Sequence, residues 1–269
     1  MINIFEELKD MGFENLEKIE LFPEKEVSNE IENKKGKRVT LEEVLYDKTY
    51  VCPVCKTEFK TKAIRSGKNR LVNSDLDLKP EYDIANPIFY ECIVCETCGY
   101  AALSKNFSTL TTSQIRWIKE KISSVYKTYH YEPIIDAKSA ISRYKLALLN
   151  SFVKKAKDGE KAYICLKLAW IYRELKDAEQ EKLFLSHALT GFENAYNNER
   201  FPIFELGELT TAYIIADIYR RFKEYDKAMQ WISYVILDKS ISLRLKTRAL
   251  HLKGVIHDEK KIAENHHIE

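Results

Sequence analysis

Apolar positions in the C-terminal part of the chain recur with the period of an α-helix. From about residue 110 hydrophobic side chains return every three to four positions, as Ile115 and Ile118 do, which predicts one buried helical face. Thr111 and Gln114 have the spacing of a capping box, so this helix is expected to run through about Tyr126. The same period predicts further helices at roughly 136–155, 160–175, 177–197, 206–223, 225–238 and 242–262.

Two of the predicted helical hairpins are similar in sequence. A shift of 47 positions aligns Cys165 with Ala212, Ala169 with Ala216 and Tyr172 with Tyr219. A small residue followed by a tyrosine at this spacing resembles a tetratricopeptide repeat, and stacked hairpins of that kind typically bind proteins or peptides. Glu181 departs from the pattern because the second hairpin has Ala228 there, so a plain helical bundle is the alternative. Trp170 and Trp231 are expected in the core.

Before residue 105 the pattern is that of short strands. Strands are expected before Cys52, over 58–64 and over 88–94. They flank two pairs of cysteines, Cys52 with Cys55 and Cys95 with Cys98. The intervening segment, 65–87, is longer than an idle connection, so we expect it to be functional or locally packed.

The fold class is therefore α+β and mostly α, with a small β module before a helical hairpin array. The three parts are an N-terminal helix (Asn3 to Met11) with a charged linker in 1–44, a zinc-ribbon-like metal module in 45–105, and a tetratricopeptide-like helical domain in 106–269.

The six cysteines carry the most chemical information in the sequence. They are Cys52, Cys55, Cys92, Cys95, Cys98 and Cys165. In a reducing compartment such clustering indicates metal binding rather than disulfides. Two residues between thiolates make a tight turn that aims both sulfurs at one point, and Gly99 suits a position of positive φ directly after such a turn. Two turns of this kind predict one four-thiolate site.

The second cluster offers three sulfurs for two ligand positions. We assign Cys52, Cys55, Cys95 and Cys98 as the ligands, because a Gly-Tyr pair follows Cys98. Cys92 lies in a predicted strand and is interpreted as a half-buried thiol or as an alternate ligand. Cys165 lies on the apolar face of a predicted helix, where a core thiol is expected.

The predicted site favours a structural metal. Four thiolates leave no open coordination position, and no histidine lies between residues 45 and 105 to serve as a base. Zn²⁺ is the expected ion. Iron is the alternative, because four thiolates also bind iron and the Cys98-Gly-Tyr ending resembles a rubredoxin.

Composition excludes several classes of protein. The chain is 45% hydrophobic and 31% charged, and 43 basic against 41 acidic residues give a net charge of +2. This balance argues against a general polyanion binder. No apolar run is long enough to span a membrane. The N-terminus carries acids early and lacks the pattern of a signal peptide, so we expect a cytoplasmic protein without membrane association.

Charge is polarised between the two halves of residues 56–91. The first half is basic, and its candidate anion or nucleic-acid contacts are Lys60, Lys62, Arg65, Lys68 and Arg70. The second half is acidic. One interpretation is a solvated hairpin whose halves neutralise each other; the others are contact with nucleic-acid phosphates, or with an anionic protein or small ligand. Catalysis around Asp75, Asp77 and Tyr82 is a weaker hypothesis, because no third ligand or base is in view.

Several motifs together resemble the bacterial domain of unknown function 2225 family. They are Tyr50-Val-Cys-Pro-Val-Cys55, Arg65-Ser-Gly-Lys68, Asp75-Leu-Asp77-Leu-Lys-Pro80, Asn86-Pro87, Cys95-x2-Cys98-Gly-Tyr, Leu168-Ala-Trp-Ile-Tyr-Arg173 and Ile218-Tyr-Arg-Arg-Phe222. The resemblance implies a bacterial cytoplasmic protein with a zinc module and a tetratricopeptide-like tail, and it implies no activity. The extra Cys92 leaves the ligand set open.

These observations favour an adaptor over an enzyme. We expect a zinc-stabilised protein that binds a protein or peptide partner through its helical repeats. The alternative is a nucleic-acid-binding protein that uses the basic hairpin. The identity of the partner is not encoded in any motif of the sequence.

Overall fold

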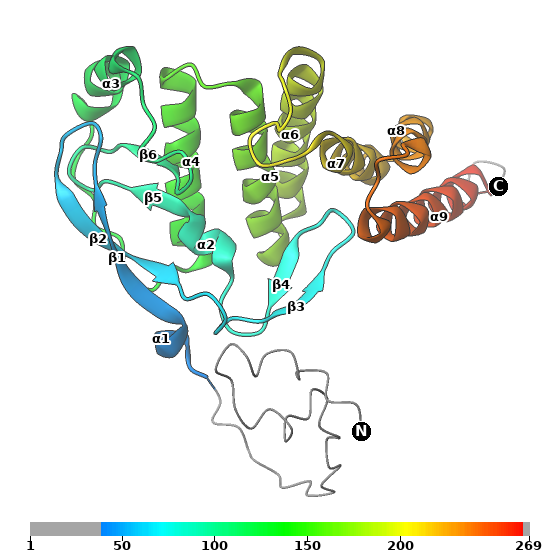
Figure 1. The fold of residues 1–269 in the computed structure, drawn as a ribbon, viewed down its shortest axis with the longest axis horizontal. Helices are drawn as coiled ribbons and strands as arrows, with labels where there is room; N and C mark the ends of the chain where they lie inside the picture. The colour runs from blue at the N-terminus through cyan, green and yellow to red at the C-terminus, as the bar shows by residue number, and fades with distance from the viewer. Residues whose placement is uncertain (1–38, 266–269) are drawn as a thin grey trace, which may run out of the picture. The chain divides into compact units, whose positions relative to one another are not determined.

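Three antiparallel strand pairs precede an array of helices in the computed structural model, which describes residues 39–265 (Figure 1). The pairs are β1 (Leu45–Val51) with β2 (Glu58–Ile64), β3 (Leu71–Ser74) with β4 (Pro80–Tyr82), and β5 (Cys92–Val94) with β6 (Ala101–Leu103). A short helix, α1 (Leu41–Val44), leads into β1. The strand predicted over 58–64 is confirmed. The predicted N-terminal helix and most of the charged linker lie outside the described residues.

The prediction of a strand over 88–94 is wrong in its first half. Residues Pro87–Glu91 form a short helix, α2, and only the last three residues of the predicted strand are extended. The side chain of Asn86 starts this helix by accepting a hydrogen bond from the N–H of Ile88 at 3.0 Å. Proline suits the first helical position because its φ is already fixed there. The local Asn-Pro signal therefore outweighs the apolar run that follows it.

The segment predicted as a long loop contains the β3–β4 hairpin. Its turn is closed by backbone hydrogen bonds from the N–H of Asp75 to the carbonyl of Lys79 at 2.8 Å and from the N–H of Leu78 to the carbonyl of Asp75 at 3.0 Å. Leu78 has a φ of +69°, a region that bulky side chains rarely adopt. The segment is thus locally packed, as its length suggested.

The remaining helices agree with the predicted ranges to within a few residues. They are α3 (Thr112–Ile118), α4 (Ala137–Val153), α5 (Asp158–Glu174), α6 (Ala178–Asn198), α7 (Glu208–Arg221), α8 (Tyr225–Leu237) and α9 (Leu243–Asn265). The capping box is confirmed, because Gln114 and Thr111 exchange side-chain to backbone hydrogen bonds of 3.0 and 3.3 Å. After α3 a π-helical turn, Lys119–Ser123, ends the element before the predicted Tyr126.

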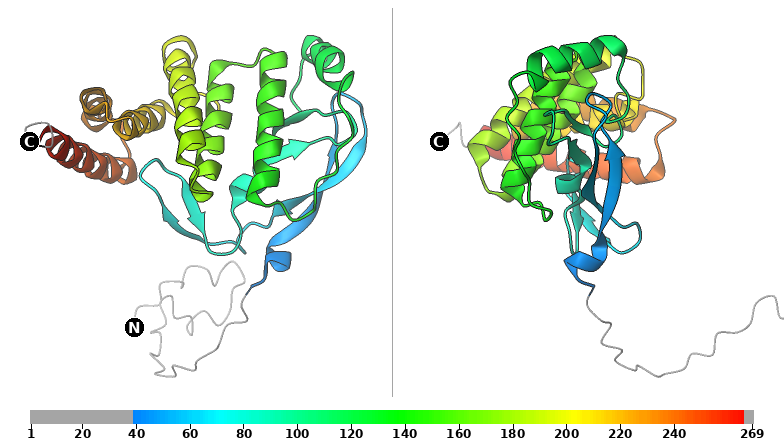
Figure 2. Two further views of the ribbon diagram at one scale, coloured as in Figure 1. Left: turned by 180° about the vertical axis from the view of Figure 1, so that it is seen from behind. Right: turned by 90° about the vertical axis from the view of Figure 1, so that its left-hand side faces the viewer.

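The helices pack mainly on their sequence neighbours. The pairs with the most extensive contact are α5 with α6 and α7 with α8, followed by α8 with α9 and α4 with α5. In both Figure 1 and Figure 2, α4, α5 and α6 stand side by side, and α7, α8 and α9 follow beyond α6. β5 and β6 lie against α4, so the strand module and the helical array share one compact unit.

Two apolar clusters form the interior. The larger one extends from β5 and β6 through α4 into α9. It includes Tyr172 and Tyr219, and also Trp170 as predicted, with the partly buried Trp231 packed against it. The smaller cluster surrounds the paired cysteines and includes Tyr100, Phe107 and Ile118. The cysteine site therefore has an apolar core of its own.

Candidate metal centre

Four cysteine sulfurs from two distant stretches of chain meet at one point. The sulfurs of Cys52, Cys55, Cys95 and Cys98 all lie within 4.8 Å of one another. The Sγ atoms of Cys52 and Cys98 are 3.6 Å apart, and those of Cys55 and Cys95 are 3.5 Å apart. A tetrahedral ion with Zn–S distances of about 2.3 Å requires sulfurs roughly 3.8 Å apart. The spacing of the four sulfurs therefore fits one tetrahedral metal ion.

The two Cys-x2-Cys turns have the same backbone construction. In the first, the N–H of Lys56 donates to the carbonyl of Cys52 at 2.9 Å; in the second, the N–H of Gly99 donates to the carbonyl of Cys95 at 2.9 Å. The residue after each second cysteine has positive φ, +67° at Lys56 and +72° at Gly99. The positive φ predicted for Gly99 is confirmed. The first turn thus has a lysine at the place where the second has a glycine.

Gly99 is required for a second reason. A Cβ atom built at this position would lie 2.5 Å from the ring of Tyr126, far inside van der Waals contact. The segment after the π-helical turn thus packs directly on the second cysteine turn. Positive φ favours glycine at position 99, and the lack of space beside Tyr126 is what restricts the position to it, since Lys56 adopts a similar φ in the first turn.

Helix α4 holds the second cysteine turn through its side chains. Asn150 donates to the carbonyl of Gly99 at 3.0 Å, and Arg143 donates to the carbonyl of Cys92 through Nη2 at 2.6 Å and Nε at 3.2 Å. The hydroxyl of Tyr144 donates to the carbonyl of Ile88 at 2.8 Å. These contacts satisfy backbone acceptors outside the β5–β6 ladder. They fix the position of two of the four sulfurs relative to the helical array.

Aromatic rings cover the site on the side of the β1–β2 ribbon. Phe107 makes edge contacts with Tyr50 and Phe59, at ring-centroid separations of 5.6 and 6.0 Å, and it packs against Tyr100 at 5.0 Å. The hydroxyl of Tyr100 donates to the carbonyl of Phe107 at 3.0 Å. Cys52 and Cys95 are fully buried. The sulfurs thus lie in a low-dielectric surrounding that excludes most water.

Hydrogen bonds among the four sulfurs make their thiols unequally acidic. Bonds from Cys52 and Cys98 lower the pKa of the Cys95 thiol. Bonding to Cys95 raises the pKa of Cys52, and bonding to Cys52 raises the pKa of Cys98. One sulfur can therefore carry a charge that its neighbours stabilise, and a cation is needed before all four can lose their protons.

The two remaining cysteines have other partners. Cys92 lies in β5, is fully buried, and its Sγ donates to the carbonyl of Arg143 at 3.2 Å. It is not a member of the four-sulfur group, and burial raises the pKa of its thiol to about 12. Cys165 is buried in α5, as predicted for a core thiol, and desolvation raises its pKa to about 12.

The predicted basic contacts lie on β2, with Lys60 and Lys62, and in the loop after it, with Arg65, Lys68 and Arg70. Lys62 pairs with Asp47 across the two strands at 2.9 Å, and the guanidinium of Arg65 lies 5.3 Å from the ring centroid of Tyr46. Arg65 and Lys68 line a shallow hollow of about 420 Å³ with Tyr46. Within the described segment 56–91, no ion pair joins the basic half to the acidic half, although Asp83 accepts a hydrogen bond from the backbone N–H of Arg70 at 2.9 Å. Three acids of the second half, Asp75, Asp77 and Glu91, pair instead with Arg173 or Lys167 on α5, which differs from the solvated-hairpin interpretation.

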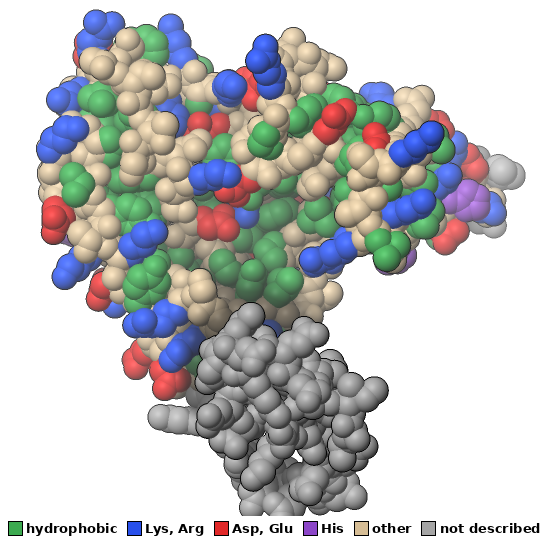
Figure 3. Space-filling model, in the orientation of Figure 1, with side chains coloured by type: hydrophobic (Ala, Val, Ile, Leu, Met, Phe, Trp, Pro, Cys, Tyr) green, Lys and Arg blue, Asp and Glu red, His purple; other side chains and the backbone are tan. Residues whose placement is uncertain are grey.

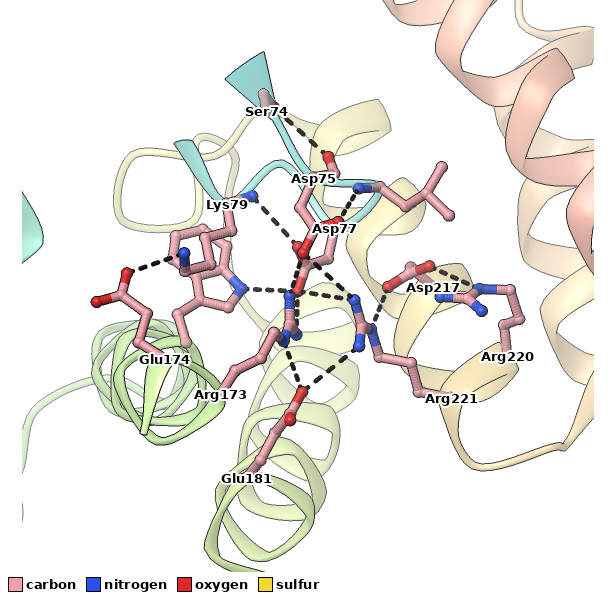
Figure 4. Close-up of polar contacts among 12 residues, drawn as sticks. Ser74, Asp75, Asp77, Lys79, Arg173, Glu174, Glu181, Asp217, Arg220 and Arg221 are labelled. Atoms are coloured by element: carbon pink, nitrogen blue, oxygen red, sulfur yellow. Dashed lines mark hydrogen bonds and ion pairs between the residues drawn. The ribbon is translucent and has the colours of Figure 1, made fainter. Parts of the chain in front are cut away.

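A group of charged side chains joins the β3–β4 turn to the helices, and we call it the Asp–Arg cluster (Figure 4). Its members are Asp75, Asp77, Arg173, Glu181, Asp217 and Arg221. Arg173 on α5 donates to Asp75 at 2.8 Å and to Asp77 at 2.6 Å. Arg221 on α7 lies 3.7 Å from the carboxylate of Asp77. One hairpin turn therefore bridges two helical hairpins.

Asp77 is the centre of the Asp–Arg cluster. It is fully buried, and the indole N–H of Trp170 donates to its carboxylate at 2.7 Å. Desolvation alone would raise the pKa of Asp77, but the hydrogen bond and charge of Arg173, together with Arg221, hold it below the ordinary value of 3.8. The carboxylate is ionised and paired, which leaves it unsuited to the acid–base role considered for Asp75, Asp77 and Tyr82.

Sequence reasoning missed the partners of this turn. Arg173, Arg221 and Trp170 each occur in stretches that carried the family resemblance, but helical periodicity predicted only a core position for Trp170 and no partner for either arginine. The available signal was the surplus of acids in 71–91, where Lys79 is the one basic residue. Only the chain path brings α5 and α7 to that turn.

Comparison with known proteins gives a family and no function. The model of the family described as "Uncharacterized protein conserved in bacteria (DUF2225)" matches residues 45–256. No curated protein and no solved structure matches the chain. Within residues 39–265, none of the helices has the length and apolar character to cross a membrane.

Proposed function

Because the chain belongs to the DUF2225 family, whose description assigns no activity, we propose a function from the geometry alone. The protein is a non-enzymatic cytoplasmic adaptor. Cys52, Cys55, Cys95 and Cys98 hold a structural Zn²⁺, and the helical array binds a protein partner. A cytoplasmic location agrees with four neighbouring thiols that must stay reduced to bind metal.

The closed set of four sulfurs is the observation that carries the proposal. The protein offers one sulfur for each of the four positions of a tetrahedral ion, since the sulfurs lie within 4.8 Å of one another. Such an ion cross-links the turn between β1 and β2 to the turn between β5 and β6. Structural zinc of this type supplies about 10–16 kcal/mol of apparent binding free energy at neutral pH. Iron fits the same donor set, and its colour in solution distinguishes it from zinc.

The Asp–Arg cluster supports the adaptor role. Its most buried carboxylate is engaged by Arg173 and Trp170, so the charged residues that might have served catalysis instead fasten the hairpin to the helices. The cluster fixes the β3–β4 hairpin to α5 and α7, so that the strands and the helical array can form one continuous surface for a partner. Stacked helical hairpins of this kind commonly bind other proteins along an extended face.

Metal analysis and partner capture with the full-length chain test the proposal. We expect about one zinc per chain by elemental analysis. We also expect a specific protein to be recovered by cross-linking to the intact chain in a bacterial lysate, and not to a metal-free Cys52→Ser/Cys98→Ser chain. A preparation with no bound metal at neutral pH would refute the metal site. Recovery of nucleic acid in place of protein would refute the adaptor role.

A second candidate function has one specific observation in its favour. The hollow lined by Tyr46, Arg65, Ser66 and Lys68 combines an aromatic ring with two basic side chains. This combination can stack a base and contact a phosphate. Phe59, the aromatic residue inside the basic stretch, is packed against Tyr50 and Phe107 and is not free to stack. We therefore rank binding of single-stranded nucleic acid second.

A further inference from the structure

A groove runs between the β3–β4 hairpin and the start of α9, on a face where hydrophobic side chains gather (Figure 3). Its volume is about 300 Å³, and it is lined by Leu71, Ser74, Leu78, Pro80, Tyr82, Ser242, Arg244, Leu245 and Arg248. The lining is mostly apolar. Its charged members are two arginines, with no acidic residue among the lining side chains.

The two arginines have donor capacity left over. Arg248 donates to the carbonyl of Asp75 at 3.4 Å, a long bond that uses one of its five N–H groups. Arg244 is exposed on the first turn of α9, and no hydrogen bond or ion pair joins it to another of the described residues. Asp75 and Asp77, which adjoin the lining residues Ser74 and Leu78 in sequence, are engaged by Arg173 at 2.8 and 2.6 Å. Glu81 and Asp83 adjoin Tyr82, but their side chains are not part of the groove lining. The lining side chains therefore carry positive charge beside apolar groups and no negative charge of their own.

Leu78 enters the groove from a strained backbone position. Its φ of +69° is unfavourable for a leucine, and the hydrogen bond from its N–H to the carbonyl of Asp75 at 3.0 Å helps to hold it. Strain of this kind persists where the surroundings over-determine the conformation, often at binding sites. Here the Asp–Arg cluster fastens the turn from behind, so the side chain of Leu78 is held at the groove lining.

The groove is open to solvent, with the β3–β4 hairpin on one side and the first turns of α9 on the other. Exposed apolar residues adjoin the lining in sequence on both sides: Val72 follows Leu71 and is 59% exposed, and Leu243 precedes Arg244 and is 82% exposed. A small-molecule site is typically more enclosed. Leucine and proline make up the rest of the apolar lining, so successive bases of a nucleic acid would have no second ring to stack on beside Tyr82. The size and chemistry of the surface fit a peptide.

We propose that this groove binds an acidic segment of a partner protein, with apolar side chains seated against Leu71, Leu78 and Leu245 and carboxylates paired with Arg244 and Arg248. Guanidinium–carboxylate pairs are often bidentate, which would fix the direction of the segment. This inference deepens the proposed adaptor function by naming the chemistry of its partner, and it rests on that function.

A charge-reversal experiment with the full-length chain tests the groove. A random peptide library displayed on phage is selected on the wild-type protein, and the selected peptides are measured by fluorescence anisotropy. We expect enrichment of Asp and Glu next to Leu, Ile or Phe. Arg244→Glu should weaken their binding about tenfold, which corresponds to about 1.4 kcal/mol. Leu71→Asn should weaken peptide binding because it removes an apolar side chain from the groove lining. Arg200→Glu, at an exposed position outside the lining, is the control and should leave peptide binding unchanged.

Arg244 makes no contact that folding needs, so loss of binding in its variant will not reflect unfolding; circular dichroism checks this. Selected peptides without acidic residues, or acidic peptides that bind Arg244→Glu as tightly as wild type, would overturn the inference. So would a self-association that Arg244→Glu abolishes, since a second copy would then occupy the groove.

The two proposals can fail separately. A captured protein partner whose binding is unchanged by Arg244→Glu and Leu71→Asn would leave the adaptor function in place and remove the groove from it. Groove-dependent acidic peptides without any captured partner protein would support the groove and count against the adaptor function.

Discussion

Arg173 on α5 and Asp77 in the β3–β4 turn are 96 positions apart in sequence, and their side chains form an ion pair of 2.6 Å. The aspartate is fully buried and the arginine is largely buried. Taking two charges out of water is unfavourable unless each finds good partners. Trp170 and Arg221 supply those partners for the carboxylate. The pair thus determines where the hairpin sits on the helical array.

Replacing Asp77 by Asn should destabilise the fold strongly. The side chain keeps its shape, but Arg173 and Arg221 lose the buried negative charge that compensates them. Removing one partner of a buried pair typically costs about 3 kcal/mol or more. Urea unfolding measures the effect. Asp75→Asn is the matched control, because Asp75 is 39% exposed and should cost less than about 1 kcal/mol. Equal losses in the two variants would contradict the central place given to Asp77.

The same residue should contribute to acid sensitivity. The pKa of Asp77 is held below its ordinary value of 3.8, so its ionised form stabilises the native state at neutral pH. That contribution is present above the unfolded-state pKa and is lost as the pH falls through the lower folded-state pKa. We expect the stability difference between wild type and Asp77→Asn to shrink below about pH 4. Thermal melts of both proteins between neutral pH and pH 3 provide the measurement. If the stability difference between wild type and Asp77→Asn grows on acidification, then the ionised form of Asp77 does not stabilise the native state.

Cys98→Ser should release the metal, whereas Cys92→Ser should keep it. Cys98 belongs to the four-sulfur group, while the sulfur of Cys92 donates to the carbonyl of Arg143, a bond that a serine hydroxyl can also make. Elemental analysis should find about one metal per chain in wild type and in Cys92→Ser, and little in Cys98→Ser. Loss of metal from Cys92→Ser with full retention in Cys98→Ser would reassign the ligand set.

Gly99→Ala should weaken both folding and metal binding more than Gly67→Ala. Both glycines have positive φ, +72° and +82°, but a Cβ at position 99 meets the ring of Tyr126 and one at position 67 meets nothing within 4 Å. Alanine in this backbone region costs about 1–2 kcal/mol, and overlap with the ring should add about 1–3 kcal/mol at position 99. Competition with a chromogenic zinc chelator measures the metal affinity.

A double variant isolates the steric part of that effect. Removing the ring with Tyr126→Ala should make the added cost of Gly99→Ala resemble that of Gly67→Ala. If the cost of Gly99→Ala is the same with and without the ring, then contact with Tyr126 does not limit position 99.

The basic ribbon should contribute little to nucleic-acid binding. Lys62 already pairs with Asp47, and Phe59 is packed against Phe107. We expect wild type and a Lys60→Ser/Arg65→Ser/Lys68→Ser variant to bind single-stranded RNA equally weakly at moderate salt. Titration of labelled RNA at two salt concentrations checks this. Tight binding that falls steeply with salt in wild type and is lost in the variant would favour the second candidate function.

Local signals in the sequence were sufficient for most helices and for the cysteine turns. Helical periodicity located α4 to α9 to within a few residues because each helix buries one face over several turns. The glycine at position 99 indicated a residue with positive φ, because glycine adopts positive φ without the steric penalty that other residues have. The choice of Cys95 and Cys98 over Cys92 likewise rested on spacing and on the residue that follows, both of which are local properties.

The tertiary structure decided what the sequence could not. Asp75 and Asp77 looked like part of a polarised loop until α5 and α7 placed Arg173 and Arg221 against them. Periodicity identifies which face of a helix is buried but not which distant segment covers it, because that depends on the path of the whole chain. The sequence by itself thus determined the two cysteine turns and the helices, while the joining of hairpin to helices and the groove beside α9 followed only from long-range packing.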